Sequence, residues 1–95
     1  MAVARKRWIT YGPRRGLGPV RDREAEARQD AIDDVRKCKS VGGTSDREEY
    51  MVDVDGYLRG PDGSFVYAKP RLFYLDPFTG LPVTAGDERD GAIQI

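Results

Sequence analysis

Residues 50–69 contain the run Tyr50-Met51-Val52-Asp53-Val54, the turn sequence Gly60-Pro61-Asp62-Gly63 and the run Ser64-Phe65-Val66-Tyr67-Ala68-Lys69, and they decide the fold expected of this chain. Both runs alternate apolar and polar positions, which is typical of strands with one buried face. In the turn, Pro presets φ, Asp tolerates the next position and Gly supplies a positive φ. The pattern predicts a β-hairpin.

A second turn extends this prediction to a meander. Asp76-Pro77-Phe78-Thr79-Gly80 follows the run Leu72-Phe73-Tyr74-Leu75, and Leu81-Pro82-Val83 comes after it. We therefore expect an antiparallel β-meander of three to four strands over about residues 49–83. The run 72–75 is apolar on both faces, whereas a small antiparallel sheet normally exposes one face to water. We expect its cover to come from the N-terminal arm, the C-terminal tail or a neighbouring chain.

One charged amphipathic helix is expected over about residues 19–40. Gly18 and Pro19 suit its N-terminus, and Gly42-Gly43 suits its end. Acidic residues lie near its start and basic residues near its end, as the helix dipole favours. The expected apolar stripe is narrow and consists of Ala25, Ala31, Ile32, Val35 and Cys38.

Residues 1–18 are predicted to form a basic extended arm. Residues 1–23 carry seven basic side chains against Asp22 alone, a charge of +6, so the rest of this neutral chain carries −6. Such a basic head is attracted to the acidic body of another copy or to a polyanion. The run Trp8-Ile9-Thr10-Tyr11 has strand character and either caps the chain's own core or anchors it on a neighbour.

Residues 84–95 are predicted to form an extended acidic tail. Its last five residues, Gly91-Ala92-Ile93-Gln94-Ile95, have strand character and could add to a sheet edge in the same chain or, as we favour, in a neighbour. The expected organisation is thus an arm (1–18), a single α+β domain (19–83) and this tail, which suits a chain of 95 residues.

The residue inventory argues against an enzyme and against a metal or cofactor. The chain has no His and a single Cys, so it lacks the usual general base and the usual zinc ligands. Asp53-Val54-Asp55-Gly56 begins like a calcium loop, but Tyr57 occupies the third ligand position and no Glu closes the loop. No carboxylate pair has a spacing that indicates acid–base chemistry.

These features favour a structural or assembly protein that makes multi-copy protein–protein contacts. Arg outnumbers Lys by twelve to four and Asn is absent, which suggests a GC-rich bacterium or its phage as the source. The most concrete version is a small phage virion component: a capsid decoration, minor capsid or head–tail joining protein. The expected partner-binding residues are Arg5, Arg7, Trp8, Ile9, Tyr11, Arg14, Arg15, Phe73, Phe78, Ile93 and Ile95.

Two alternatives stay open at this point. Residues 5–15 interleave cations with aromatic side chains, which suits a small nucleic-acid-binding protein. A phage-encoded inhibitor of a host protein would use the same surfaces as an assembly protein. The N-terminus lacks the apolar stretch of a signal peptide and no run is long enough to span a bilayer, so we expect the virion or the bacterial cytoplasm as its location.

Overall fold

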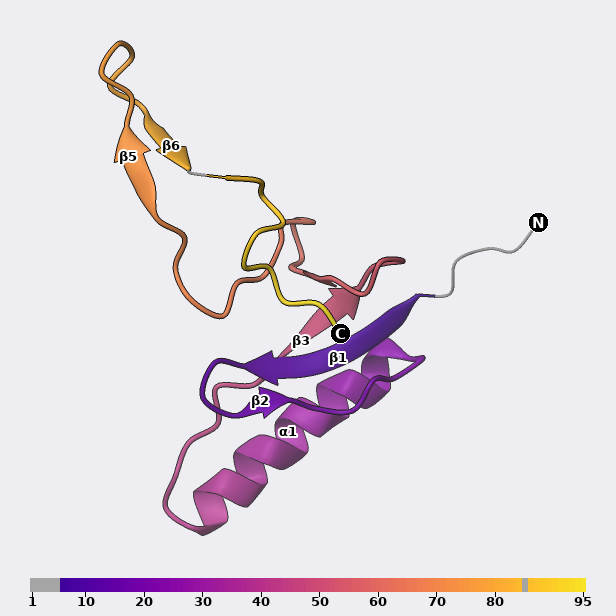
Figure 1. The fold of residues 1–95 in the computed structure, drawn as a ribbon. Helices are drawn as coiled ribbons and strands as arrows, with labels where there is room; N and C mark the ends of the chain where they lie inside the picture. Colours follow the sequence, from indigo (N-terminus) through magenta and orange to yellow (C-terminus); the bar gives the residue numbers. More distant parts are fainter. Residues whose placement is uncertain (1–5, 85) are drawn as a thin grey trace, which may run out of the picture.

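The computed structural model describes residues 6–84 and 86–95 and confirms the α+β class, with one helix and antiparallel strands (Figure 1). The elements are β1 (Arg7–Gly12), β2 (Gly16–Leu17), α1 (Glu24–Ser40), β3 (Glu48–Val52), β4 (Leu58–Arg59), β5 (Phe73–Leu75) and β6 (Pro82–Thr84). Four of the strands form one antiparallel sheet in the order β2-β1-β3-β4, and β5 and β6 form a separate hairpin.

Strand β1 lies inside the sheet, which corrects the prediction that residues 7–12 belong to an arm. It pairs antiparallel with β3, with Trp8 opposite Met51 and Thr10 opposite Glu49, and β2 pairs along its other edge. The β-branched and aromatic residues of β1 suit a central strand, because both faces of that strand are covered. Residues 1–5 of the predicted arm lie outside the described residues.

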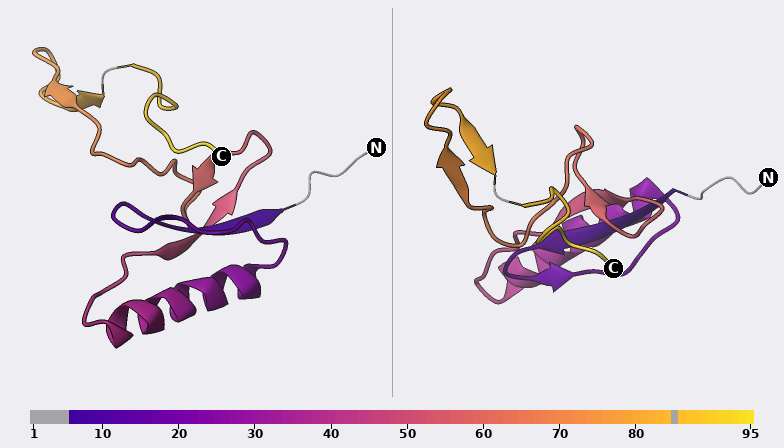
Figure 2. Two further views of the ribbon diagram at one scale, coloured as in Figure 1. Left: turned by 60° about the horizontal axis from the view of Figure 1, so that its bottom comes forward. Right: turned by 45° about the horizontal axis from the view of Figure 1, so that its top comes forward.

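The two faces of this sheet have different covers. Alternation along the strands puts Ile9, Tyr11, Val52 and Leu58 on one face, where they form the buried core. Val66 and Ile93, from outside the four strands, pack against this core. Helix α1 covers the opposite face, where Arg28 reaches Glu49 at 3.2 Å; Figure 2 shows the helix on one side of the sheet and the C-terminal tail on the other.

Helix α1 starts five residues later than predicted, and its buried stripe shares only Cys38 with the predicted one. Residues 19–23 are not helical, because the backbone of Arg21 bonds to that of Trp8 in both directions, at 2.7 and 2.8 Å. The buried helical residues are Ala27, Asp34 and Cys38. Ile32 and Val35, expected in the stripe, are 41% and 44% exposed. The predicted end is confirmed, since Gly42 has a φ of 78° and the Gly43 N–H bonds to the Cys38 carbonyl at 2.8 Å.

The first predicted turn forms as expected. The Gly60 N–H donates to the Ser64 carbonyl at 2.9 Å, and Gly63 has a φ of 82°. This turn brings Phe65 opposite Arg59, so the chain after β4 folds back along it. The predicted meander is therefore realised from β3 to this turn.

The C-terminal segment adds to its own chain, which corrects the preference for a neighbour. Tyr57 pairs with Gln94, and Tyr67 pairs with Ala92. The Ile93 N–H donates to the Val66 carbonyl at 2.9 Å, and its own carbonyl accepts from the Leu58 N–H at 3.1 Å. Segment 92–95 thus lies between two strand-like stretches and completes the core. We call the four-stranded sheet, α1 and segment 92–95 the body.

The meander does not continue to residue 83 within one sheet, which is the remaining correction to its predicted extent. The chain leaves the body after Tyr67 and returns near Glu88, and hairpin β5–β6 lies between these points, away from the body (Figure 1). The radius of gyration is 16.2 Å, against about 12 Å for a compact domain of this length. The structure is therefore somewhat extended.

Candidate protein-interaction site

Hairpin β5–β6 is held by local turn chemistry. The Asp76 carboxylate accepts the backbone N–H groups of Phe78 at 2.7 Å and Thr79 at 3.3 Å. Gly80 has a φ of 70° and donates its N–H to the Asp76 carbonyl at 2.8 Å. An Asp side chain that accepts the backbone N–H groups of its own turn, with a Gly at the end of the turn, specifies such a tip from local residues alone. The tip therefore presents Phe78 in a defined position.

The side chains of this hairpin are apolar and open to solvent. Phe78 is 95% exposed, and every residue of β5 is exposed. Six large apolar residues belong to this surface, with exposed fractions between 56% and 95%: Leu72, Phe73, Tyr74, Leu75, Phe78 and Leu81. This exposed apolar surface is the candidate interaction site. The prediction named only Phe73 and Phe78 of this set, although the run 72–75 that is apolar on both faces already signalled the others.

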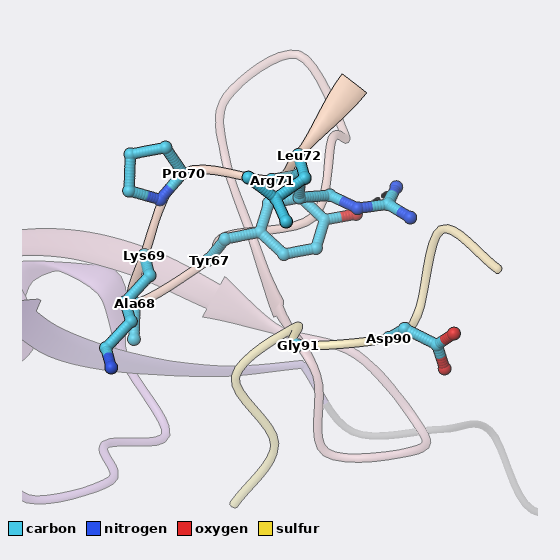
Figure 3. Close-up of a pocket in the computed structure, with 8 residues that line it drawn as sticks. All are labelled: Tyr67, Ala68, Lys69, Pro70, Arg71, Leu72, Asp90 and Gly91. Atoms are coloured by element: carbon cyan, nitrogen blue, oxygen red, sulfur yellow. Dashed lines mark hydrogen bonds between the residues drawn. The ribbon is translucent and has the colours of Figure 1, made fainter. Parts of the chain in front are cut away.

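A pocket of about 420 Å³ lies at the base of the hairpin (Figure 3). Its lining comes from residues 67–72 and from Asp90 and Gly91. The Arg71 guanidinium donates to the Asp87 carbonyl at 2.7 Å and to the Tyr67 hydroxyl at 3.4 Å, and the Tyr67 hydroxyl donates to the Glu88 carbonyl. These contacts join the two ends of the hairpin to each other.

The basic residues predicted to meet a partner are partly engaged within the chain. Arg15 makes a two-pronged ion pair with Asp34 at 2.8 and 3.1 Å, and its side chain is 37% exposed. The Arg14 side chain is exposed, and its backbone N–H donates to the Asp46 carboxylate at 2.8 Å. Arg7 is half-buried within β1, and Arg5 lies outside the described residues.

Asp34 is the centre of a buried polar cluster between α1 and two loops. Besides Arg15, its carboxylate accepts from the Ser45 hydroxyl and from Arg47 at 3.4 Å. Hydrogen bonds from Arg15 and then Ser45 hold the pKa of Asp34 well below its ordinary value, despite its burial. Arg47 also donates to three carbonyls of the β1–β2 hairpin, those of Arg15, Gly16 and Leu17. The cluster therefore links α1 to the β1–β2 hairpin and to the loop before β3.

The predicted aromatic and apolar contacts of the N- and C-terminal segments lie mostly within the body. Ile9 and Tyr11 are 1% and 7% exposed, so they belong to the core and not to a docking surface, which corrects their assignment. Trp8 is half-buried on the helix-facing side. Ile93 is half-buried against the core, and Ile95 is partly exposed. Sequence reasoning could not distinguish a core strand from an anchor, because both use the same residue types.

Neither a metal site nor a membrane span is found in the described part of the chain. Across residues 6–84 and 86–95, no three Cys, Asp or Glu side chains come together as a set of metal ligands. Helix α1 is too short and too charged to cross a bilayer, and it is the only helix in those ranges.

Comparisons with protein families, curated proteins and solved structures give no match to this chain.

Proposed function

We propose that this chain is a non-enzymatic assembly protein and that hairpin β5–β6 is its docking element. The most concrete form is a small phage virion component, such as a capsid decoration, minor capsid or head–tail joining protein, in multi-copy contact with itself or other subunits. The observation that carries the proposal is the exposure of six large apolar side chains on a hairpin held outside the body.

The size of this surface supports the proposal. A large apolar side chain has about 200 Å² of surface, so the six exposed residues leave on the order of 800 Å² open. That area is about what one partner contributes to a standard protein–protein interface. Burying it would stabilise a complex in proportion to the apolar area removed from water.

The charge distribution of the hairpin also favours a protein partner. Asp76 is the single charged residue from Leu72 to Thr84, and its carboxylate is engaged by the turn backbone. A surface that meets nucleic acid needs cations that neutralise phosphates. This hairpin has none, whereas the core of a protein–protein interface is typically depleted of charge.

Sedimentation velocity over a range of protein concentrations tests the proposal. We expect the wild-type chain to form complexes at micromolar concentrations and Phe73→Asp to shift it to monomer, because a charge is then placed within the apolar surface. Val54→Asp is the matched control, since Val54 is an exposed apolar residue of the loop between β3 and β4, outside the hairpin. A chain that is monomeric throughout, or is equally affected by both variants, contradicts the proposal.

Nucleic-acid binding is the second candidate, through residues 5–15. Exposed Lys6 and Arg14 support it, although Arg15 is already paired with Asp34. A gel-shift series in increasing salt separates the two candidates. Binding that persists near physiological salt and is lost in Arg14→Ala favours the nucleic-acid function over the assembly function.

A further inference from the structure

We propose that the free edge of β5 pairs antiparallel with the β5 edge of a second copy of this chain, about a two-fold axis at Tyr74. The inference rests on the proposed function, because it names both the partner and the geometry with which the hairpin docks.

The hydrogen-bond pattern of the hairpin shows which backbone groups are free. The Asp76 N–H donates to the Leu81 carbonyl at 2.9 Å, and Leu75 lies opposite Pro82. Hydrogen-bonded and non-hydrogen-bonded pairs alternate in an antiparallel ladder, so Tyr74 and Val83 form the next hydrogen-bonded pair. The N–H and C=O groups of Phe73 and Leu75 therefore point away from β6.

Nothing in the described residues occupies this edge. No backbone hydrogen bond joins Phe73 or Leu75 to a segment outside the hairpin within residues 6–84 and 86–95. In Figures 1 and 2 no other segment lies beside β5 on the side away from β6. The β5 edge is thus an open template for another strand.

The two edges of the hairpin differ in what they can accept. Pro82 sits at an outward-pointing position of β6 and has no N–H to donate. Strand β5 has neither Pro nor a charged residue, which are the usual protections of an exposed edge. Pairing is therefore directed to β5.

A two-fold axis at Tyr74 uses every free group of β5. It places Phe73 of one copy opposite Leu75 of the other, and each of these two equivalent pairs exchanges both hydrogen bonds. The two Tyr74 residues then face each other as a non-hydrogen-bonded pair. An axis at Leu75 would instead pair Phe73 with Pro77, which lacks an N–H.

The flanking charges favour a second copy in this antiparallel orientation. Lys69 and Arg71 precede the apolar run and Asp76 follows it. With the axis at Tyr74, Leu72 lies opposite the partner's Asp76, so Arg71 comes next to that carboxylate. A parallel arrangement would bring like charges together instead. The zero net charge of the chain adds no general repulsion between copies.

Disulfide trapping tests the axis directly. Non-hydrogen-bonded neighbours have Cα atoms about 4.5 Å apart, within the range that a disulfide spans. We expect Tyr74→Cys to form a disulfide-linked dimer when its two thiols are oxidised with diamide. Wild-type protein, whose single Cys38 is buried, and Phe78→Cys serve as controls and should remain largely unlinked.

Proline substitution tests the edge without disturbing the hairpin ladder. Leu75→Pro removes an outward N–H that the dimer would use twice, so we expect it to weaken association about tenfold or more in sedimentation experiments. Thr84→Pro removes an outward N–H from the β6 edge and should leave association unchanged.

The outcomes separate this inference from the proposed function. Trapping at Tyr74→Cys together with selective loss in Leu75→Pro supports β5 pairing. A chain that associates but is trapped through Phe78→Cys, or is weakened equally by Thr84→Pro, overturns β5 pairing and leaves the assembly function intact. A chain that is monomeric in every experiment overturns both.

Discussion

The turn at residues 60–63 and the turn at residues 76–80 are built by the same chemistry but have opposite surroundings. Each uses a short carboxylate that accepts backbone N–H groups and a Gly with positive φ. The first connects β4, where Leu58 is fully buried, to Val66, which packs against the core. The second lies at the tip of hairpin β5–β6, where Phe78 is almost fully exposed. Local chemistry therefore specifies a hairpin, and only contacts distant in sequence decide whether it becomes core or surface.

Truncation of a core side chain should give the largest difference between the two regions. We expect Leu58→Ala to lower the free energy of unfolding by about 2–5 kcal/mol, because Leu58 is enclosed by the sheet and by Ile93. Leu75→Ala, in the exposed hairpin, should change it by less than about 0.5 kcal/mol. Urea denaturation of the monomeric protein measures both. Similar losses in the two variants would show that the hairpin packs as part of the core.

Removal of the Asp34 charge should cause the next largest loss in the free energy of unfolding. Asp34→Asn weakens its contacts with Arg15, Ser45 and Arg47, and we expect a loss of about 2 kcal/mol at neutral pH. Because the pKa of Asp34 is lowered on folding, its contribution is fully present above its unfolded pKa of about 4 and is lost as pH falls through the folded value. The difference between wild type and Asp34→Asn should therefore shrink below about pH 4. Asp33→Asn, on the exposed side of the same helix, is the control. If the difference in free energy of unfolding between wild type and Asp34→Asn does not change with pH, the ionised Asp34 side chain is not the source of that stability.

Two glycines with equivalent geometry allow a finer comparison. Gly63 and Gly80 have φ values of 82° and 70°, and a Cβ at either would meet no neighbouring atom. Alanine at each position costs about 1 kcal/mol through the backbone alone. Gly63→Ala should lower global stability by that amount, whereas Gly80→Ala should only loosen the hairpin and speed hydrogen exchange of its own amides about fivefold. A global loss in Gly80→Ala would mean that the hairpin and body unfold as one unit.

Excision of the hairpin should have the smallest effect on stability. Phe73 and Thr84 are paired neighbours, so a Gly-Gly linker in place of residues 73–84 can join the two ends. We expect the free energy of unfolding to change by no more than about 0.5 kcal/mol, while concentration-dependent association disappears. Denaturation and sedimentation of the same variant measure both quantities. Loss of the fold would refute the separation between hairpin and body.

Features that depend on residues close together in sequence could be predicted. Both turns, the end of α1 at Gly42 and the apolar character of residues 72–75 follow from residue types a few positions apart. The α+β class follows from the same signals. The sequence also predicted an uncovered apolar surface, because it has more apolar residues than one narrow helix could cover.

Features that depend on contacts between segments distant in sequence could not be predicted. Residues 7–12 could be assigned to an arm because the sequence of one strand does not specify which other strand pairs with it. The structure shows that the partner is β3. The start of α1 was misplaced because Arg21 bonds to Trp8, which helix propensity does not encode. Asp34 was not expected to be buried, since the groups that compensate its charge come from the loops containing Arg15 and Ser45.

The order of the strands has a consequence for how the chain folds. Strands β1 and β3 are neighbours in the sheet, yet the whole of α1 lies between them in sequence. Their pairing must close a loop of roughly forty residues, which costs more chain entropy than closing a short hairpin turn. Early helix formation shortens that loop, so α1 acts as a spacer that brings β1 to β3. We therefore expect the pairing of β1 with β3 to limit the rate of folding, and we expect the local hairpin β5–β6 to have little influence on that rate.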